Sequence, residues 1–197
     1  MSFRLGLTGS IGMGKSTTAQ LFAASGCAVW DADAAVHRLY SASGRAVEPM
    51  RAAFPMAVEG DTVSRAALRD VIAADPSALH RIERIVHPLL AQDRAEFIGA
   101  ASSDILVFDI PLLFETGGDA AMDAVVVVTA PPEIQRARVL DRGTMTEAQF
   151  EAILEKQMPD AEKRARADFV IVTDTPDHAR AQVEQIIRTI RKDMTHA

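Results

Sequence analysis

The chain has 197 residues, of which 48% are hydrophobic and 24% charged, a composition typical of one globular core with smaller attachments. Its net charge of −6 argues against a general nucleic-acid binder, whose contact face is usually basic. No apolar run approaches the roughly 18 residues that span a bilayer, and a strand-like pattern starts too early for a signal peptide. The single cysteine excludes an internal disulfide framework. We therefore expect a cytoplasmic protein, monomeric and without nucleic-acid or membrane partners.

Five short apolar runs alternate with helical patterns along the chain. They cover residues 4–8, 27–30, 105–108, 125–128 and 169–172. Because these runs are apolar throughout and do not alternate, they predict parallel strands that are covered on both faces. The order of strands and helices predicts a doubly wound α/β fold with a five-stranded parallel sheet.

Two stretches fall outside this alternation. Residues 34–87 show helical patterning without a convincing strand, and the helix is expected to end or kink where Pro88 follows His87. Residues 136–158 are charged and helical, interrupted by Gly143. Insertions of this kind often cover a site that is built at the strand ends.

A complete phosphate-loop motif follows the first strand. The pattern G-x-x-x-x-G-K-[ST] is matched by Gly9, Ser10, Ile11, Gly12, Met13, Gly14, Lys15 and Ser16, and Thr17 comes next. Its glycines allow the backbone N–H groups and the N-terminus of the next helix to surround phosphate oxygens. Lys15 would supply a cation to the β- and γ-phosphates, and Ser16 a hydroxyl ligand for Mg²⁺. The motif predicts triphosphate binding, but it does not separate kinases from GTPases, motors or switches.

Acidic residues follow two further strands, at the edge where parallel sheets form their ligand crevice. Asp31 and Asp33 would point to the same side of an extended backbone, where they could orient an acceptor hydroxyl and bind Mg²⁺. A solvated turn or a helix N-cap is the alternative for this pair. Asp109, after four apolar residues, resembles the second nucleotide motif of P-loop proteins, whose aspartate helps to hold Mg²⁺. Helix capping is the alternative there as well.

Two later segments carry further candidates. Leu112, Leu113 and Glu115 follow Pro111 near the expected mouth of the crevice, although ordinary packing would also explain the two leucines. Arg138 and Arg142 are four residues apart, so one helical face would carry both. They could neutralise charge on a transferring phosphoryl group. They could equally pair on a solvated face with nearby acids, namely Glu133, Asp141, Glu147 and Glu151.

Together these pieces resemble the dephospho-CoA kinase family over nearly the whole chain. The phosphate loop is shared with many families, whereas the combination of Asp-Ala-Asp, His-Pro and Pro-Leu-Leu-Phe-Glu is much more specific. The matching stretches are residues 6–17, 31–33, Arg65 with Leu68, His87-Pro88, residues 111–115, Gln135 with Arg138 and Arg142, Gln157, and Ala167-Asp168. Two departures are Ser10, where glycine is common, and Thr173-Asp174, where many members carry asparagine. We therefore assign no adenine contact to residues 173–174.

The resemblance implies ATP- and Mg²⁺-dependent phosphorylation of the ribose 3′-hydroxyl of dephospho-CoA, the final step of coenzyme A synthesis. It also implies a nucleotide-binding core (residues 1–33, 88–135 and 159–197), a helical acceptor-binding domain (residues 34–87) and a lid (residues 136–158). Asp33 takes the position of the general base, and Lys15, Arg138 and Arg142 are the other catalytic candidates. The acceptor-binding candidates are Asp31, Asp33, Arg65, His87, Leu112, Leu113 and Glu115.

Two competing hypotheses use the same phosphate loop. A GTPase switch normally carries an Asn-Lys-x-Asp motif after a later strand, and residues 129–131 and 173–175 lack it. Another small-metabolite kinase, acting on a nucleoside monophosphate, shikimate or gluconate, would share the loop and the lid. Such a kinase would not share the Asp-Ala-Asp, His-Pro and Pro-Leu-Leu-Phe-Glu set.

Overall fold

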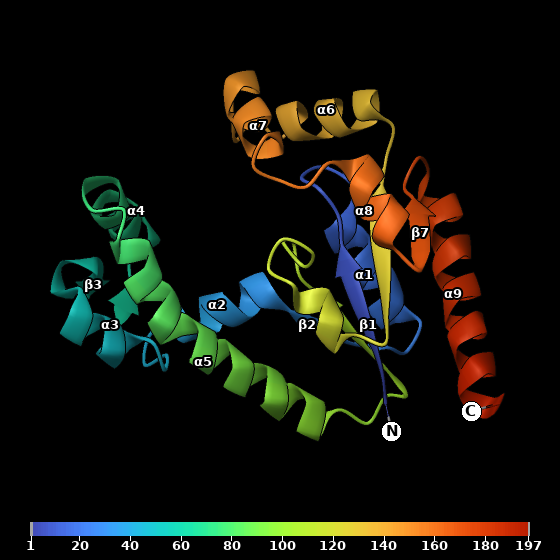
Figure 1. The fold of residues 1–197 in the computed structure, drawn as a ribbon, viewed down its shortest axis with the longest axis horizontal. Coiled ribbons are helices and arrows are strands. Elements are labelled where there is room, and N and C mark those ends of the chain that lie inside the picture. The colour runs from blue at the N-terminus through green and yellow to red at the C-terminus, as the bar shows by residue number, and fades with distance from the viewer. Residues whose placement is uncertain (1, 197) are drawn as a thin grey trace. The chain divides into compact units, whose positions relative to one another are not determined.

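The main sheet of the protein has five strands. The computed structural model describes residues 2–196. The strands are β1 (Phe3–Thr8), β2 (Ala28–Asp31), β5 (Ile105–Asp109), β6 (Ala124–Thr129) and β7 (Phe169–Val172), in the order β2-β5-β1-β6-β7 (Figure 1). β1 is parallel to both β5 and β6, and β6 is parallel to β7. The predicted α/β class and its five-stranded parallel sheet are confirmed.

Different segments bury the two faces of this sheet. Leu7 and Val126 lie in a core that includes residues of α1 (Lys15–Ala24) and α9 (Pro176–His196). Val125 and Val127 lie in a second core, which includes residues of the segment after β5 and has Met158 and Ala167 packed against it. α8 (Asp160–Arg166) contacts β6. Because neighbouring residues of β6 are buried on opposite faces, five consecutive residues, Ala124 to Val128, are apolar.

Two helices follow β6, after the carboxyl ends of the strands (Figure 1). α6 (Pro132–Asp141) starts with a proline, whose missing N–H costs nothing at that position. α7 (Glu147–Leu154) starts with a capping box in which Thr146 and Gln149 bond each other's backbone N–H groups. Both helices belong to the same compact unit as the phosphate loop.

The chain divides into two compact units, one of Met1–Trp30 with Ala101–Ala197 and one of Asp31–Ala100. The second unit has its own core, which includes Met50, Phe54 and Leu68. Its elements are α2 (Ala32–Tyr40), α3 (Val47–Ala53), η1 (Pro55–Ala57), β3 (Val58–Glu59), β4 (Thr62–Val63), α4 (Arg65–Ala74) and α5 (Ala78–Ala100). A further short helix, η2 (Gly118–Ala121), belongs to the first unit.

The second unit differs from the sequence prediction in two places. β3 and β4 form an antiparallel hairpin in the stretch where no strand was expected, since two residues per strand are too few to show an alternating pattern. The helix that we expected to end or kink at His87-Pro88 does not end there, because α5 continues to Ala100 with Pro88 inside it. The predicted boundary between residues 87 and 88 therefore falls within a helix.

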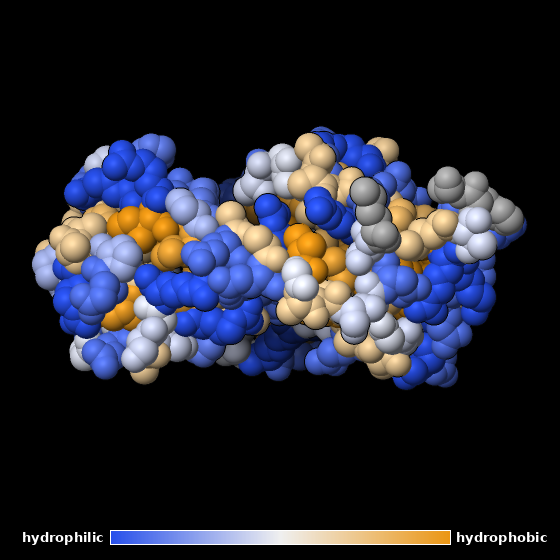
Figure 2. Space-filling model, turned by 90° about the horizontal axis from the view of Figure 1, so that it is seen from below, coloured by the Kyte–Doolittle hydropathy of each residue, from blue (hydrophilic) through white to orange (hydrophobic). Residues whose placement is uncertain are grey.

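The surface is mixed in character. On the face shown in Figure 2, hydrophobic groups lie among predominantly hydrophilic ones. The large hydrophobic side chains that are exposed are Met56, Leu79, Leu112 and Val170. Within residues 2–196 no helix combines the length and the apolar character needed to cross a membrane.

The one cysteine, Cys27, lies just before β2 and is 6% exposed. Burial raises the pKa of its thiol to about 11, and the opposing charge of Arg191 only partly offsets this. The thiol is therefore uncharged at neutral pH.

Candidate active site

The loop between β1 and α1 has the backbone of a phosphate-binding turn. Gly12 and Gly14 have φ angles of 78° and 93°, which residues with a Cβ rarely adopt. Gly9 is required for a different reason, because a Cβ there would lie 2.6 Å from the carbonyl oxygen of Val128. All three glycines of the motif are thus explained by the geometry of the loop.

The N-terminus of α1 is left open to an anion. Its N-cap residue is Gly14, no side chain caps it, and its first turn contains no acidic residue. The N–H groups of the first turn therefore carry the partial positive charge of the helix end without a carboxylate to compensate it. Ser16 and Thr17 are exposed at this end. The arrangement suits a phosphate group.

Lys15 and Asp109, which follow the first and the third predicted strands, lie in contact beside the loop. The Lys15 ammonium forms an ion pair with the Asp109 carboxylate, which is 1% exposed at the end of β5. The register explains the contact, because Leu7 of β1 lies opposite Asp109. Sequence reasoning proposed both residues separately, and the structure places them in direct contact.

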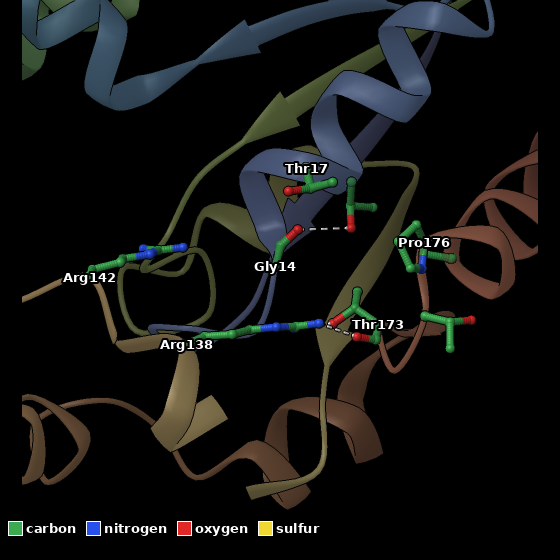
Figure 3. Close-up of a pocket in the computed structure, with 9 residues that line it drawn as sticks. Gly14, Thr17, Arg138, Arg142, Thr173 and Pro176 are labelled. Atoms are coloured by element: carbon green, nitrogen blue, oxygen red, sulfur yellow. Dashed lines mark hydrogen bonds between the residues drawn. The ribbon is translucent and has the colours of Figure 1, made fainter. Parts of the chain in front are cut away.

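A cavity of about 300 Å³ adjoins the loop (Figure 3). It lies between the start of α1, the helix α6 and the start of α9. Its lining residues are Gly14, Thr17, Thr18, Arg138, Arg142, Thr173, Thr175, Pro176 and Ala179. The two predicted arginines are therefore in the same cavity as the phosphate loop.

Arg138 is fixed across this cavity. Its guanidinium donates one hydrogen bond to the Thr173 hydroxyl at 2.8 Å and another to the Thr173 carbonyl (Figure 3). The same hydroxyl donates to the carbonyl of Met13 in the phosphate loop, at 2.6 Å. Pairing with acids on a solvated face, the alternative considered for the arginines, applies to Arg136, which contacts Glu147. Arg138 is instead a wall of the cavity.

Residues 173–176 are the part of the site that sequence reasoning missed. We assigned no contact to Thr173-Asp174 from the sequence, and the structure shows that Thr173, Thr175 and Pro176 line the cavity beside Gly14. The signal that could have found them is their place after the last parallel strand, because ligand crevices form outside such strand ends. No contact was assigned to this position because the chain lacks the asparagine that many family members carry there.

The backbone does not stay extended from Asp31 to Asp33, as the prediction for this pair required. β2 ends at Asp31, and α2 starts directly at Ala32. Asp31 is the N-cap of α2, and its carboxylate accepts a hydrogen bond from the Ala34 N–H at 3.0 Å. For Asp31 the capping alternative is therefore correct. Asp33 lies in the first turn of α2 and is exposed, so its carboxylate is open to a ligand.

Arg65 and His87 belong to the Asp31–Ala100 unit, as Asp33 does. Arg65 is exposed at the first position of α4, and its guanidinium lies 5.8 Å from the centre of the Tyr40 ring. Burial raises the pKa of Tyr40, although the Arg65 charge opposes this. His87 is exposed within α5. Their predicted contacts with an acceptor stay predictions.

The predicted acceptor stretch after β5 is divided between core and surface. Leu113 is fully buried, and a Cβ at Gly6 would lie 2.7 Å from its Cδ2 atom. We therefore correct the prediction that the Leu113 side chain contacts an acceptor, because packing occupies it. Leu112 is 43% exposed and remains open to a ligand.

Glu115 is held by structural contacts. Its carboxylate lies 2.8 Å from the ammonium of Lys163, which is fully buried, and it accepts a hydrogen bond from the Met158 N–H at 2.9 Å. Burial alone would raise the pKa of Glu115, but these two contacts outweigh it and keep the pKa below its usual 4.5. Glu115 thus connects the segment after β5 to Met158, just before α8.

The oxygen ligands at the loop fit magnesium. Among residues 2–196 no group of three or more His, Cys, Asp or Glu side chains could hold a metal by itself. Magnesium in kinases needs no such group, because one or two protein oxygens act together with phosphate oxygens and water. The Ser16 hydroxyl and the Asp109 carboxylate are the hard oxygen donors that this arrangement uses.

Comparison with known proteins agrees with this geometry. The family model for dephospho-CoA kinase matches residues 3–178. A dephospho-CoA kinase of Ruegeria pomeroyi is 72% identical over 197 residues, which cover 100% of both chains. The structure of TT1252 from Thermus thermophilus has a TM-score of 0.86 at 31% identity, covering 95% of this chain and 97% of that one. A dephospho-CoA kinase structure from Campylobacter jejuni has a TM-score of 0.69 at 24% identity, over 98% and 99% of the two chains, and so supports the fold.

The central β1, the glycine-bent loop and the Lys15–Asp109 pair are those of a P-loop kinase. Sequence similarity over the full length then narrows the assignment from P-loop kinases in general to one family. The chain belongs to the dephospho-CoA kinase family.

Proposed function

We propose that the chain transfers the γ-phosphoryl group of ATP to the ribose 3′-hydroxyl of dephospho-CoA, giving coenzyme A and ADP. One observation supports the proposal most directly. In this member of the family, the phosphate loop, whose Lys15 forms an ion pair with Asp109, opens into a nucleotide-sized cavity. The loop and the cavity account for ATP, and the family accounts for the acceptor.

ATP would bind with its phosphates in the loop and its nucleoside in the cavity. Pro176 and Ala179 offer apolar surface to a purine, and the Arg138 guanidinium offers a flat cation. The contact between Thr173 and Met13 joins this cavity to the loop. The position of the adenine base of ATP is thereby linked to the position of its phosphates.

Phosphoryl transfer needs charge neutralisation and positioning, because its transition state is loose and places charge on the phosphoryl oxygens. The backbone N–H groups of the loop, Lys15 and Arg142 would provide this at the γ-phosphate. Ser16 and Asp109 would hold Mg²⁺, which neutralises charge on the β- and γ-phosphates when bound. Lys15 would exchange part of its contact with Asp109 for the phosphates.

Asp33 is the proposed general base. Its carboxylate would accept a hydrogen bond from the 3′-hydroxyl and take the proton late in the transfer. Asp31 is less suited to this role, because the N-terminus of α2 already uses its carboxylate. Arg65, His87 and Leu112 would contact the rest of the acceptor.

The division of labour among segments belongs to the same proposal. Residues 34–87 would bind the acceptor, and residues 136–158 would act as a lid that excludes water from the phosphoryl group. The presence of Arg138 and Arg142 in the cavity supports the lid assignment. We also propose a monomer that works in the cytoplasm. Light scattering should then give a mass near 21.2 kDa, and fractionation should recover the protein with cytoplasmic markers.

The test is an acceptor panel with Mg-ATP. Dephospho-CoA should give stoichiometric ADP and a product heavier by one phosphoryl group, with ³¹P–¹H coupling to the ribose H3′. Shikimate, gluconate and nucleoside monophosphates should give only background ADP. Preference for another acceptor, or ADP formation that does not depend on any acceptor, would reject the proposed activity.

A further inference from the structure

Two glutamines hold one peptide group of the phosphate loop. The side-chain amide of Gln135 donates a hydrogen bond to the carbonyl oxygen of Ile11, at 2.7 Å. The side-chain oxygen of Gln157 accepts a hydrogen bond from the N–H of Ile11, at 3.1 Å. Ile11 is therefore bonded through both its donor and its acceptor by side chains more than 120 residues away in sequence.

The two glutamines flank the proposed lid segment, with Gln135 directly before its first residue and Gln157 near its end. Gln135 lies on α6 and is 6% exposed, and Gln157 follows α7. The next residue of the loop is packed against α6 as well, because a Cβ on Gly12 would lie 2.6 Å from Cγ2 of Val139 and 2.9 Å from the carbonyl of Gln135. Polar contacts and close packing thus fix the same point of the loop.

Gln157 is itself held in place. Its neighbour Met158 donates its N–H to Glu115, whose carboxylate pairs with the buried Lys163. The Gln157 bond to Ile11 therefore starts from a fixed backbone. The backbone of Gln135 is fixed as well, because Gln135 lies on a helix and its own N–H donates a hydrogen bond to the carbonyl of Pro131.

We propose that Gln135 and Gln157 are positioning residues, which hold the Ile11 peptide so that the following N–H groups face the β- and γ-phosphates. A loop that contains Gly12 and Gly14 has many accessible conformations, and only a few of them direct its N–H groups inward. Donors that are oriented before the ligand arrives bind charge without the cost of rearrangement. The inference rests on the proposed nucleotide site, and it does not depend on the identity of the acceptor.

The proposal predicts a selective effect on binding. Ile11 precedes the part of the loop that surrounds the β-phosphate, whereas the cavity residues and the start of α1 serve the nucleoside and the α-phosphate. Losing either glutamine should therefore weaken the binding of ADP and leave the binding of AMP unchanged. A general loss of structure would weaken both.

The variants are Gln135→Met and Gln157→Met, which keep side-chain volume and remove the polar atoms, together with the double variant. Gln149→Met is the control, because the Gln149 side chain bonds Thr146 in the capping box of α7. Affinities for ADP and AMP are measured by calorimetry on the full chain. Each single variant should raise the Kd of ADP about tenfold, equal to about 1.4 kcal/mol, with the Kd of AMP within about twofold of wild type.

The double variant decides whether the two bonds act as a unit. Because both hold one peptide, the double variant should lose much less than the product of the single losses. Equal weakening of ADP and AMP, unchanged ADP affinity, a similar loss in Gln149→Met, or multiplicative losses would each overturn the proposal. If wild type binds ADP but does not phosphorylate dephospho-CoA, the proposed activity fails and the ADP measurements still judge the glutamines.

Discussion

Replacing one partner of the Glu115–Lys163 ion pair should destabilise the protein much more than replacing the other. Lys163 is fully buried, whereas the Glu115 side chain is 18% exposed and keeps the Met158 N–H as a partner. Replacing Glu115 with Gln preserves shape and leaves a buried ammonium without its counter-charge. Replacing Lys163 with Met removes the buried charge itself. The two single variants therefore break the same contact but should lower the free energy of unfolding by very different amounts.

The expected magnitudes follow from the exposure of each partner. Breaking a buried pair by removing one partner costs about 3 to 5 kcal/mol, and we take the lower limit, about 3, for Glu115→Gln because the carboxylate reaches solvent. For a chain of this size that corresponds to a decrease in Tm of about 6 to 12 °C. Lys163→Met should cost about 1 kcal/mol, because Glu115 can stay hydrated and hydrogen-bonded. The double variant should be more stable than Glu115→Gln alone.

Tryptophan fluorescence provides the assay. Trp30 is the only tryptophan of the chain, is 5% exposed and packs on Phe108 of the same unit, with ring centroids 6.2 Å apart. Its emission therefore follows unfolding of the unit that contains the ion pair. If Lys163→Met is as destabilising as Glu115→Gln, or if the two losses simply add in the double variant, the reasoning about the buried ammonium is wrong.

Three further predictions concern catalysis and pH. Lys15→Met should lower kcat by at least about a hundredfold and also lower Tm, because Asp109 loses its cation in a buried place; full activity in a coupled ADP assay would contradict this. Asp33→Asn should lower kcat on the order of 10² or more while the Kd of ATP stays near that of wild type, and near-normal turnover would reject the base assignment. The Glu115 carboxylate has a lowered pKa in the folded state, so its stabilisation is complete above its usual 4.5 and disappears as the pH falls through the lower folded value; the acid-induced loss of Tm should therefore be smaller in Glu115→Gln than in wild type.

The strands and the phosphate loop could be predicted because their signals are local. A parallel strand buried on both faces is apolar along most of its length, as β6 is from Ala124 to Val128, and the loop needs its glycines at fixed spacing. Asp109 was found by the same reasoning, since it directly follows an apolar strand.

Contacts between distant segments could not be predicted in this way. Thr173 reaches Met13 across 160 residues, and Gln157 reaches Ile11 across 146, so no spacing rule connects them. The capping role of Asp31 depended on where α2 starts, and the burial of Leu113 depended on a space beside Gly6 in another strand. Each of these needed the three-dimensional packing.

The buried Cys27 has a practical consequence for spectroscopy. With a pKa near 11, on the order of one thiol in ten thousand is ionised at pH 7, and its burial shields it further from alkylating reagents. Maleimide dyes or nitroxides should therefore attach selectively to cysteines introduced on the surface, with the native residue left in place. A labelled pair at Glu151 and Arg188, both exposed and on α7 and α9, would turn any nucleotide-driven displacement of α7 into a distance that can be followed during turnover.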